Sequence, residues 1–168
     1  EYFDRTEENA IDFVSQFDGN GNFIGGGYEN ITGKREIDGI ELDLNWKTSE
    51  TFTITAHYAD YNFGDPTQFY RIPSQKYGLN VQYDVTPQTR IGLNYNHFGE
   101  REAAIFSDPF LVSLDSYDLV NFSINHELFD GDLVLTGAIN NIFDEDFVGV
   151  YGFGTTPANF RLGILAKF

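Results

Sequence analysis

Two short segments, FYRIP and VYGFG, combine aromatic rings with an arginine or with glycines. Aromatic faces stack on planar groups, and a guanidinium pairs with anionic groups. These residue types predict contact with a planar anionic ligand. The alternative that the rings only pack the two segments against the rest of the protein stays open. The candidate ligand-binding residues are Phe69, Tyr70, Arg71, Tyr151 and Phe153.

The segment QFDGNGNFIGGGYE offers a weak calcium site. Asp18, Asn20, Asn22 and Glu29 stand at positions 1, 3, 5 and 12 of a calcium-binding loop, and their oxygens are of the hard type that Ca²⁺ prefers. Phe23, however, stands where such a loop needs glycine. A flexible loop rich in Gly and Asn is the alternative interpretation.

No other constellation predicts catalysis or a cofactor. The glycines do not fit a dinucleotide-binding pattern. Single histidines lie on separate predicted strands, which favours structural roles over a metal or catalytic centre, and an acidic cluster is interpreted as a solvated rim. We therefore expect no enzyme activity, no cofactor and no resident metal. The residues considered are His57, His97, His126, Asp144, Glu145 and Asp146.

Composition narrows the classes of partner. The chain has 26 acidic and 10 basic residues and a net charge of −16, so the basic stripe that nucleic acid requires is missing. It has no cysteine, which excludes disulfides and thiol chemistry. No apolar run approaches the roughly 20 residues of a membrane-spanning helix.

Period-two alternation of apolar and polar residues recurs along the chain and predicts β-strands. In DGIELDLNW, for example, Ile40, Leu42, Leu44 and Trp46 share one face. Similar alternation, weakest in the first segment, predicts strands at residues 6–14, 38–46, 51–60, 76–85, 90–98, 117–129, 132–140 and 159–168.

The connections between these strands alternate strictly between short and long. Minimal turns lie at 47–50, 86–88 and 129–132, and long connections lie at 16–27, 62–75, 99–116 and 143–158. All tight turns therefore share one end of the sheet. Together with strand lengths near the ~9–11 residues that cross a bilayer, this indicates an antiparallel up-and-down transmembrane β-barrel.

Aromatic residues lie at the short-turn end of the apolar face. Trp46, Tyr83 and Phe168 occupy this position, where an interfacial belt of a membrane barrel would lie. The last predicted strand ends in Phe168 after alternating apolar residues, which is similar to the C-terminal signature by which outer-membrane barrels are recognised for assembly.

The stretch YDLVNFSINHELFDGDLVLTGAINNIFDEDF, the Tyr- and Gly-containing loop after it and the final strand ending in Phe resemble the end of a TonB-dependent outer-membrane receptor. EIDGIELDLNW resembles an upstream strand of that family. The resemblance covers about residues 30–168. It implies an all-β chain that supplies about the last eight strands of a plugged barrel of about 22. Residues 1–168 would then be the C-terminal part of the barrel domain, with the plug domain absent.

The resemblance also implies function and partners. The protein would sit in the outer membrane of a Gram-negative bacterium and import a scarce, bulky nutrient, with a ferric siderophore first and cobalamin or an oligosaccharide next. Its partners would be outer-membrane lipid, TonB through the missing N-terminal part, and the barrel-assembly machinery through the C-terminal strand.

Two other architectures remain open at this point. A complete eight-stranded outer-membrane barrel with a structural or adhesive role would explain the alternation and the terminal phenylalanine, although the Asn-, Gly- and Thr-rich polar faces suit a wider lumen. A soluble β-sandwich that binds carbohydrate would also alternate. The sandwich does not predict the strict order of short and long connections.

Overall fold

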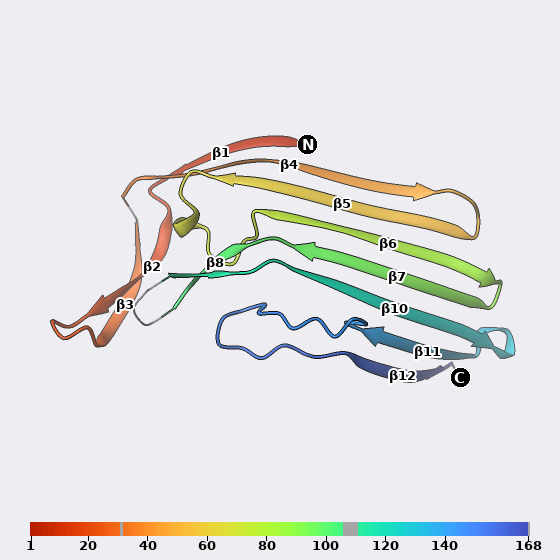
Figure 1. Ribbon diagram of the computed structural model, residues 1–168. Coiled ribbons are helices and arrows are strands. Elements are labelled where there is room, and N and C mark those ends of the chain that lie inside the picture. Colours follow the sequence, from red (N-terminus) through yellow and green to blue (C-terminus); the bar gives the residue numbers. More distant parts are fainter. Residues whose placement is uncertain (31, 106–110, 168) are drawn as a thin grey trace.

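The computed structural model describes residues 1–30, 32–105 and 111–167, and these residues form mainly antiparallel β-strands. Eight strands make one sheet in the order β1-β4-β5-β6-β7-β10-β11-β12 (Figure 1). No helix in the described ranges is long and apolar enough to span a bilayer. The strands of this sheet are β1 (Tyr2–Glu8), β4 (Lys34–Lys47), β5 (Phe52–Phe63), β6 (Gln75–Thr86), β7 (Thr89–Phe98), β10 (Tyr117–Leu128), β11 (Leu133–Asn140) and β12 (Asn159–Ala166).

The predicted order of short and long connections is confirmed. Tight turns join β4 to β5, β6 to β7 and β10 to β11, the last through the 3-10 turn η2 (Phe129–Gly131). The other connections are long and gather at the opposite end of the sheet, which we call the long-connection end (Figure 1). One of them contains the 3-10 turn η1 (Pro66–Gln68).

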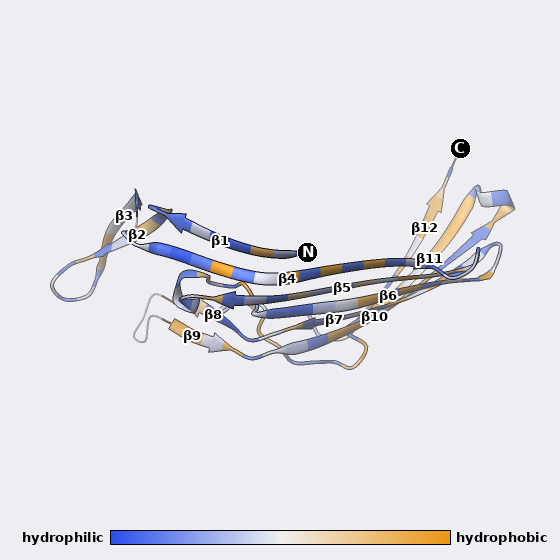
Figure 2. Cartoon of the chain, turned by 90° about the horizontal axis from the view of Figure 1, so that it is seen from above, coloured by the Kyte–Doolittle hydropathy of each residue, from blue (hydrophilic) through white to orange (hydrophobic). Residues whose placement is uncertain are grey.

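Two expected loops contain strands of their own. The hairpin of β2 (Ile11–Phe17) and β3 (Phe23–Asn30) extends beyond the long-connection end (Figure 1). At the same end β8 (Arg101–Ala104) pairs with β9 (Leu111–Leu114) (Figure 2). The single weak strand expected at 6–14 is therefore wrong. Asn9 has a φ of +56°, which ends β1 before β2 begins.

The register of the sheet gathers apolar and polar residues on opposite faces. Ile54, Val81 and Leu93 pair across β5, β6 and β7, whereas Thr55, Asn80 and Asn94 pair one position away. Successive side chains of a strand point to opposite faces, so the first row belongs to an apolar face and the second to a polar face. Figure 2 shows the bands of hydrophobic and hydrophilic residues that this alternation produces along β4.

The sheet has no conventional core. Among the described residues the buried apolar side chains are Phe69, Ala103 and Leu114, all at the long-connection end, while many apolar residues of the strands are exposed. No second large sheet covers either face in the described ranges, so the sandwich alternative does not fit. An apolar face without a protein cover is the arrangement that a membrane barrel requires.

The sheet is open at both edges. β1 pairs with β4 and β12 pairs with β11, and β1 and β12 do not pair with each other in the described part of the chain. A closed eight-stranded barrel is therefore not formed. The open sheet agrees with the prediction of a partial barrel, because an unpaired strand edge leaves backbone hydrogen-bonding groups to be completed by further strands.

Candidate functional site

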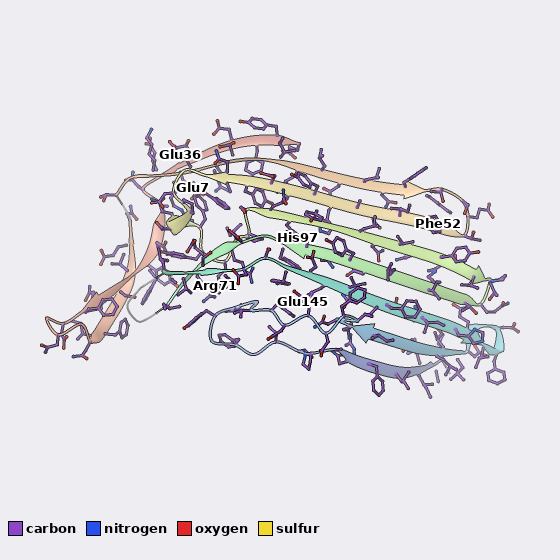
Figure 3. All side chains as sticks on the ribbon, viewed as in Figure 1. Glu7, Glu36, Phe52, Arg71, His97 and Glu145 are labelled. Carbon is purple, nitrogen blue, oxygen red and sulfur yellow. The ribbon has the colours of Figure 1, made fainter. Side chains whose placement is uncertain are left out.

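Both predicted ligand-binding segments lie at the long-connection end. Phe69, Tyr70 and Arg71 follow η1 in the β5–β6 connection, and Tyr151 and Phe153 lie in the β11–β12 connection. Figure 3 shows Arg71 near β8, and Glu145 in the β11–β12 connection. The structure thus places both segments on one end of the sheet.

Phe69 packs inside its own connection. It is 7% exposed, stacks on Phe63 with ring centroids 4.9 Å apart, and carries the Arg35 guanidinium 4.9 Å above its ring. Arg35 Nη2 also donates a hydrogen bond of 2.9 Å to the carbonyl of Gln68. The packing interpretation therefore fits Phe69, whereas the next residue, Tyr70, is 42% exposed.

Arg71 is held by its backbone and leaves its side chain available. Its φ of +64° turns the chain, and its N–H donates a hydrogen bond of 2.7 Å to the carbonyl of Glu102 in β8. Ser74 N–H reaches the carbonyl of Glu100 at 3.2 Å. The exposed Arg71 guanidinium has no hydrogen-bond or ion-pair partner among the described residues. Arg71 therefore carries an exposed positive charge that no described residue neutralises.

The β11–β12 connection exposes Tyr151 and Phe153, and its first residues are held by hydrogen bonds. Their side chains are 50% and 73% exposed, and a hydrogen bond of 3.1 Å from Phe153 N–H to Val150 O closes the turn between them. At the base, the buried Asn141 exchanges two hydrogen bonds of 2.9 Å with the backbone of Glu145. The exposed residues Tyr151 and Phe153 therefore follow a segment that hydrogen bonds hold in place.

The acidic cluster interpreted as a solvated rim has a partly structural role. Asp144 Oδ1 accepts a hydrogen bond of 2.7 Å from the N–H of Ala158, which ties the two ends of the β11–β12 connection together. Sequence reasoning also missed Asn141. In the sequence, Asn141 stands out only as part of NNIFDEDF, a segment that resembles the family. The resemblance does not indicate which side chain of this segment forms its hydrogen bonds.

The calcium candidates are only partly brought together. Asp18 Oδ1 accepts hydrogen bonds of 2.8 and 2.9 Å from the N–H groups of Asn20 and Asn22, and these interactions, led by the Asn22 side chain, lower the pKa of Asp18. Glu29 lies in β3 opposite Asp12, six positions along the hairpin from Asp18. The described residues contain no group of three or more His, Cys, Asp or Glu side chains that could hold a metal.

The three histidines lie on three different strands, β5, β7 and β10. His97 Nδ1 lies 2.9 Å from Asp118 Oδ1, and His126 Nδ1 lies 2.8 Å from Thr89 Oγ1. His57 lies on β5.

Two of the three predicted membrane-interface residues can be placed. Trp46, near the end of β4, is 57% exposed, and Tyr83, in β6, is 42% exposed and packs edge-on against Phe52. Both lie near the short turns on the apolar face, and Phe168 lies outside the described residues. Their contact with lipid stays a prediction.

The β5–β6 connection is expected to loosen in acid. Asp65 accepts hydrogen bonds from Thr67 Oγ1 and from Thr67 N–H, and the side-chain bond is the main reason that the pKa of Asp65 is lowered. The stabilisation is therefore present above the ordinary pKa near 3.8 and is lost as pH falls through the lower folded value. In an NMR titration of the Asp65 carboxyl, Thr67→Val should move the midpoint upward. An unchanged midpoint would contradict the assignment.

The fold combines an open antiparallel meander, one apolar and one polar face, and long connections at a single end. The family of TonB-dependent receptor-like β-barrels matches residues 1–142. The chain belongs to this family. TonB-dependent receptors are outer-membrane transport receptors of Gram-negative bacteria, and the family identity agrees with the all-β sheet, its open edges and the strand pattern.

Solved TonB-dependent receptors share the fold over almost the whole chain. The pyoverdine outer membrane receptor FpvA from Pseudomonas aeruginosa PAO1 matches with a TM-score of 0.73 and 17% identity, over 99% of this chain and 26% of that one. The ferric-catecholate import receptor Fiu from E. coli K12 gives 0.69 and 17%, over 97% and 24%. The FrpB iron transporter from Neisseria meningitidis gives 0.71 and 14%, over 97% and 28%. The chain spans about a quarter of the length of these receptors.

Proposed function

We propose that residues 1–168 form the C-terminal part of the barrel of an outer-membrane receptor that imports a ferric siderophore. The plug domain and the contact with TonB would belong to a part of the receptor N-terminal to this chain. The long-connection end would face the medium and bind the ligand. The short-turn end would face the periplasm, with Trp46, Tyr83 and Phe168 at the membrane interface. The barrel-assembly machinery would recognise the last strand.

The observation that carries this proposal is the side-chain chemistry of the long-connection end. Arg71 offers an exposed guanidinium without a partner among the described residues, although the chain as a whole has a net charge of −16. Tyr70, Tyr151 and Phe153 add exposed aromatic surface at the same end. Ferric siderophores combine planar or aromatic chelating groups with negative charge, which stacking and a guanidinium can recognise together.

The neighbouring structures favour this class of ligand over the alternatives. One is a receptor bound to pyoverdine, and another is an import receptor for ferric catecholates. A cobalamin or an oligosaccharide would use the aromatic surface but would gain less from the Arg71 cation. We therefore place these two ligands behind the ferric siderophore.

Binding of ferric siderophores to the full-length receptor tests the proposal. The double variant Tyr151→Ala/Phe153→Ala should bind roughly tenfold more weakly, because two stacking contacts of ~0.5–1.5 kcal/mol each are removed. Arg71→Gln should weaken the binding of anionic ferric siderophores in particular. A titration monitored by intrinsic fluorescence measures both effects.

Phe129→Ala supplies the matched control. Phe129 is an exposed aromatic residue, at 75%, but it lies in η2 at the short-turn end. Its loss should leave the affinity unchanged. A parent receptor that binds no member of a ferric siderophore panel, or variants that bind as tightly as the parent, would contradict the proposal.

A further inference from the structure

Arg101 is a buried cation that hydrogen-bonds to backbone carbonyls of two connections. It is the first residue of β8 and is 6% exposed. Its Nη1 donates hydrogen bonds of 3.3 Å to the carbonyls of Gly99 and Asp115, next to the β8–β9 hairpin. Its Nη2 donates to the carbonyl of Val148 and, at 3.3 Å, to that of Gly149, both in the β11–β12 connection.

No carboxylate forms an ion pair with Arg101 among the described residues. Its guanidinium instead lies 5.0 Å from the centre of the Tyr117 ring. A buried charge is costly unless hydrogen bonds and dipoles replace its water, and here four carbonyls and one aromatic face do so. Because the guanidinium is covered, it is not available to a ligand, and its contacts serve to join segments of the protein.

Tyr117, the aromatic partner of Arg101, also contacts the β11–β12 connection. Tyr117 stacks on Phe98 at 4.9 Å and on Phe147 at 4.4 Å. Phe147 directly precedes the carbonyl that Arg101 Nη2 binds. The β11–β12 connection is therefore fixed to the sheet by a ring stack and by a fork of hydrogen bonds at adjacent residues.

The β5–β6 connection is also fixed to β8, through backbone hydrogen bonds. The carbonyl of Glu102 in β8 accepts the hydrogen bond from Arg71 N–H, and the carbonyl of Glu100, just before β8, accepts the one from Ser74 N–H. A cavity of about 180 Å³ lies between this connection and the β8–β9 hairpin and is lined by Phe69 and Arg101, among others. β8 thus contacts one predicted ligand-binding segment through its backbone, and the Arg101 side chain contacts Val148 and Gly149, which directly precede the other segment.

We propose that Arg101 is a positioning residue that holds the two ligand-binding segments in one fixed arrangement through β8. The mechanical part of this inference stands on the contacts of Arg101 and on the backbone hydrogen bonds that the carbonyls of Glu100 and Glu102 accept, and its effect on ligand affinity rests on the proposed function. Holding Tyr151 and Phe153 in place before the ligand arrives lowers the entropy that binding must lose. Arg101 would therefore raise affinity without touching the ligand.

Spin-label distances in the full-length receptor test the mechanical part. Ala104 in β8 and Thr156 in the β11–β12 connection are exposed and can be replaced by labelled cysteines, since these 168 residues contain no cysteine. The parent should give one narrow distance distribution. Arg101→Gln should lose the narrow peak, because a neutral amide cannot supply the fork of donors to two connections. A distribution as narrow as that of the parent would overturn the proposal.

Two further variants make the result specific. Arg161→Gln removes an exposed arginine of β12 and should keep the narrow peak. Arg101→Lys keeps the charge but lacks the planar fork, so it should broaden the distribution less than the glutamine variant does. If Arg101→Gln fails to assemble, the lysine variant decides, and a parent-like peak in it would count against the proposal.

Affinity measured on the same samples separates this inference from the proposed function. Ferric siderophore binding should be roughly tenfold weaker in Arg101→Gln, because pre-organisation of the β11–β12 connection is lost. A broadened distance with no siderophore binding even to the parent would support the positioning role and contradict the proposed function. Broadening with unchanged siderophore affinity would overturn the claim that positioning serves this ligand.

Discussion

Leu79→Arg should destabilise the assembled barrel by about 2–4 kcal/mol, the usual effect of a cation on the lipid-facing side of a membrane barrel near its midplane. Leu79 is 39% exposed and pairs with Ala56 in β5 and Tyr95 in β7 on the apolar face. In the proposed outer-membrane barrel this exposed surface would contact acyl chains, which cannot solvate a guanidinium. The loss of stability therefore depends on which face of the sheet carries the arginine, and not on the loss of a contact within the protein.

The neighbouring residue provides the control for this prediction. Asn80→Arg places the same side chain one position along β6, on the polar face, where water can reach it, and should cost far less. Unfolding of the full-length receptor by urea in lipid vesicles measures both free energies. Equal destabilisation by the two arginines would mean that the apolar face is not the one in contact with lipid.

Gly39→Ala should cost about 1–3 kcal/mol, as expected when a methyl group enters a site without space for it. A Cβ at Gly39 would lie 2.5 Å from the carbonyl oxygen of Asp60, 3.0 Å from Cδ1 of Tyr61 and 3.2 Å from Cζ of Phe3. The nearest atom belongs to the backbone of β5, so a side-chain rotation cannot relieve the contact. The strand pairing of β4 with β5 would have to shift.

Gly27→Ala separates this steric effect from the general effect of replacing a strand glycine. A Cβ at Gly27, in β3, would meet no atom within 4 Å, and this glycine has no positive φ. Its replacement should leave the urea midpoint nearly unchanged. If Gly39→Ala unfolds at the same urea concentration as Gly27→Ala, the close approach between β4 and β5 does not govern stability.

The large sheet could be predicted because its information is local. Alternation in residues 38–46 and 76–85 defines the faces of β4 and β6 regardless of what they pair with. The tight turns then determine which strands are neighbours. The same reasoning places Tyr83 and Trp46 near the short-turn end, since their position depends only on strand direction and on the nearest turn.

The base of the candidate site could not be predicted, because its contacts either join residues far apart in the sequence or use backbone groups. Arg101 binds the carbonyl of Val148, and backbone carbonyls leave no trace in the residue types. Likewise, Asn141 N–H donates to Asn121 Oδ1 and Phe69 lies under Arg35, and both contacts join segments distant in the sequence. The hairpins β2–β3 and β8–β9 were missed for a different reason: the first is rich in glycine, and the second has strands of only four residues.

The strand order of the large sheet also bears on how the barrel forms. From β4 to β12, each strand pairs with the next strand of the sheet along the chain, and the β8–β9 hairpin lies in the connection between β7 and β10. Three of these pairings therefore close tight turns at a small entropic cost, and the longer connections add to that cost only slowly because loop-closure entropy grows with the logarithm of loop length. Folding can then proceed as a series of hairpin additions, and β1 and β12 would provide the edges at which this part joins its neighbouring strands.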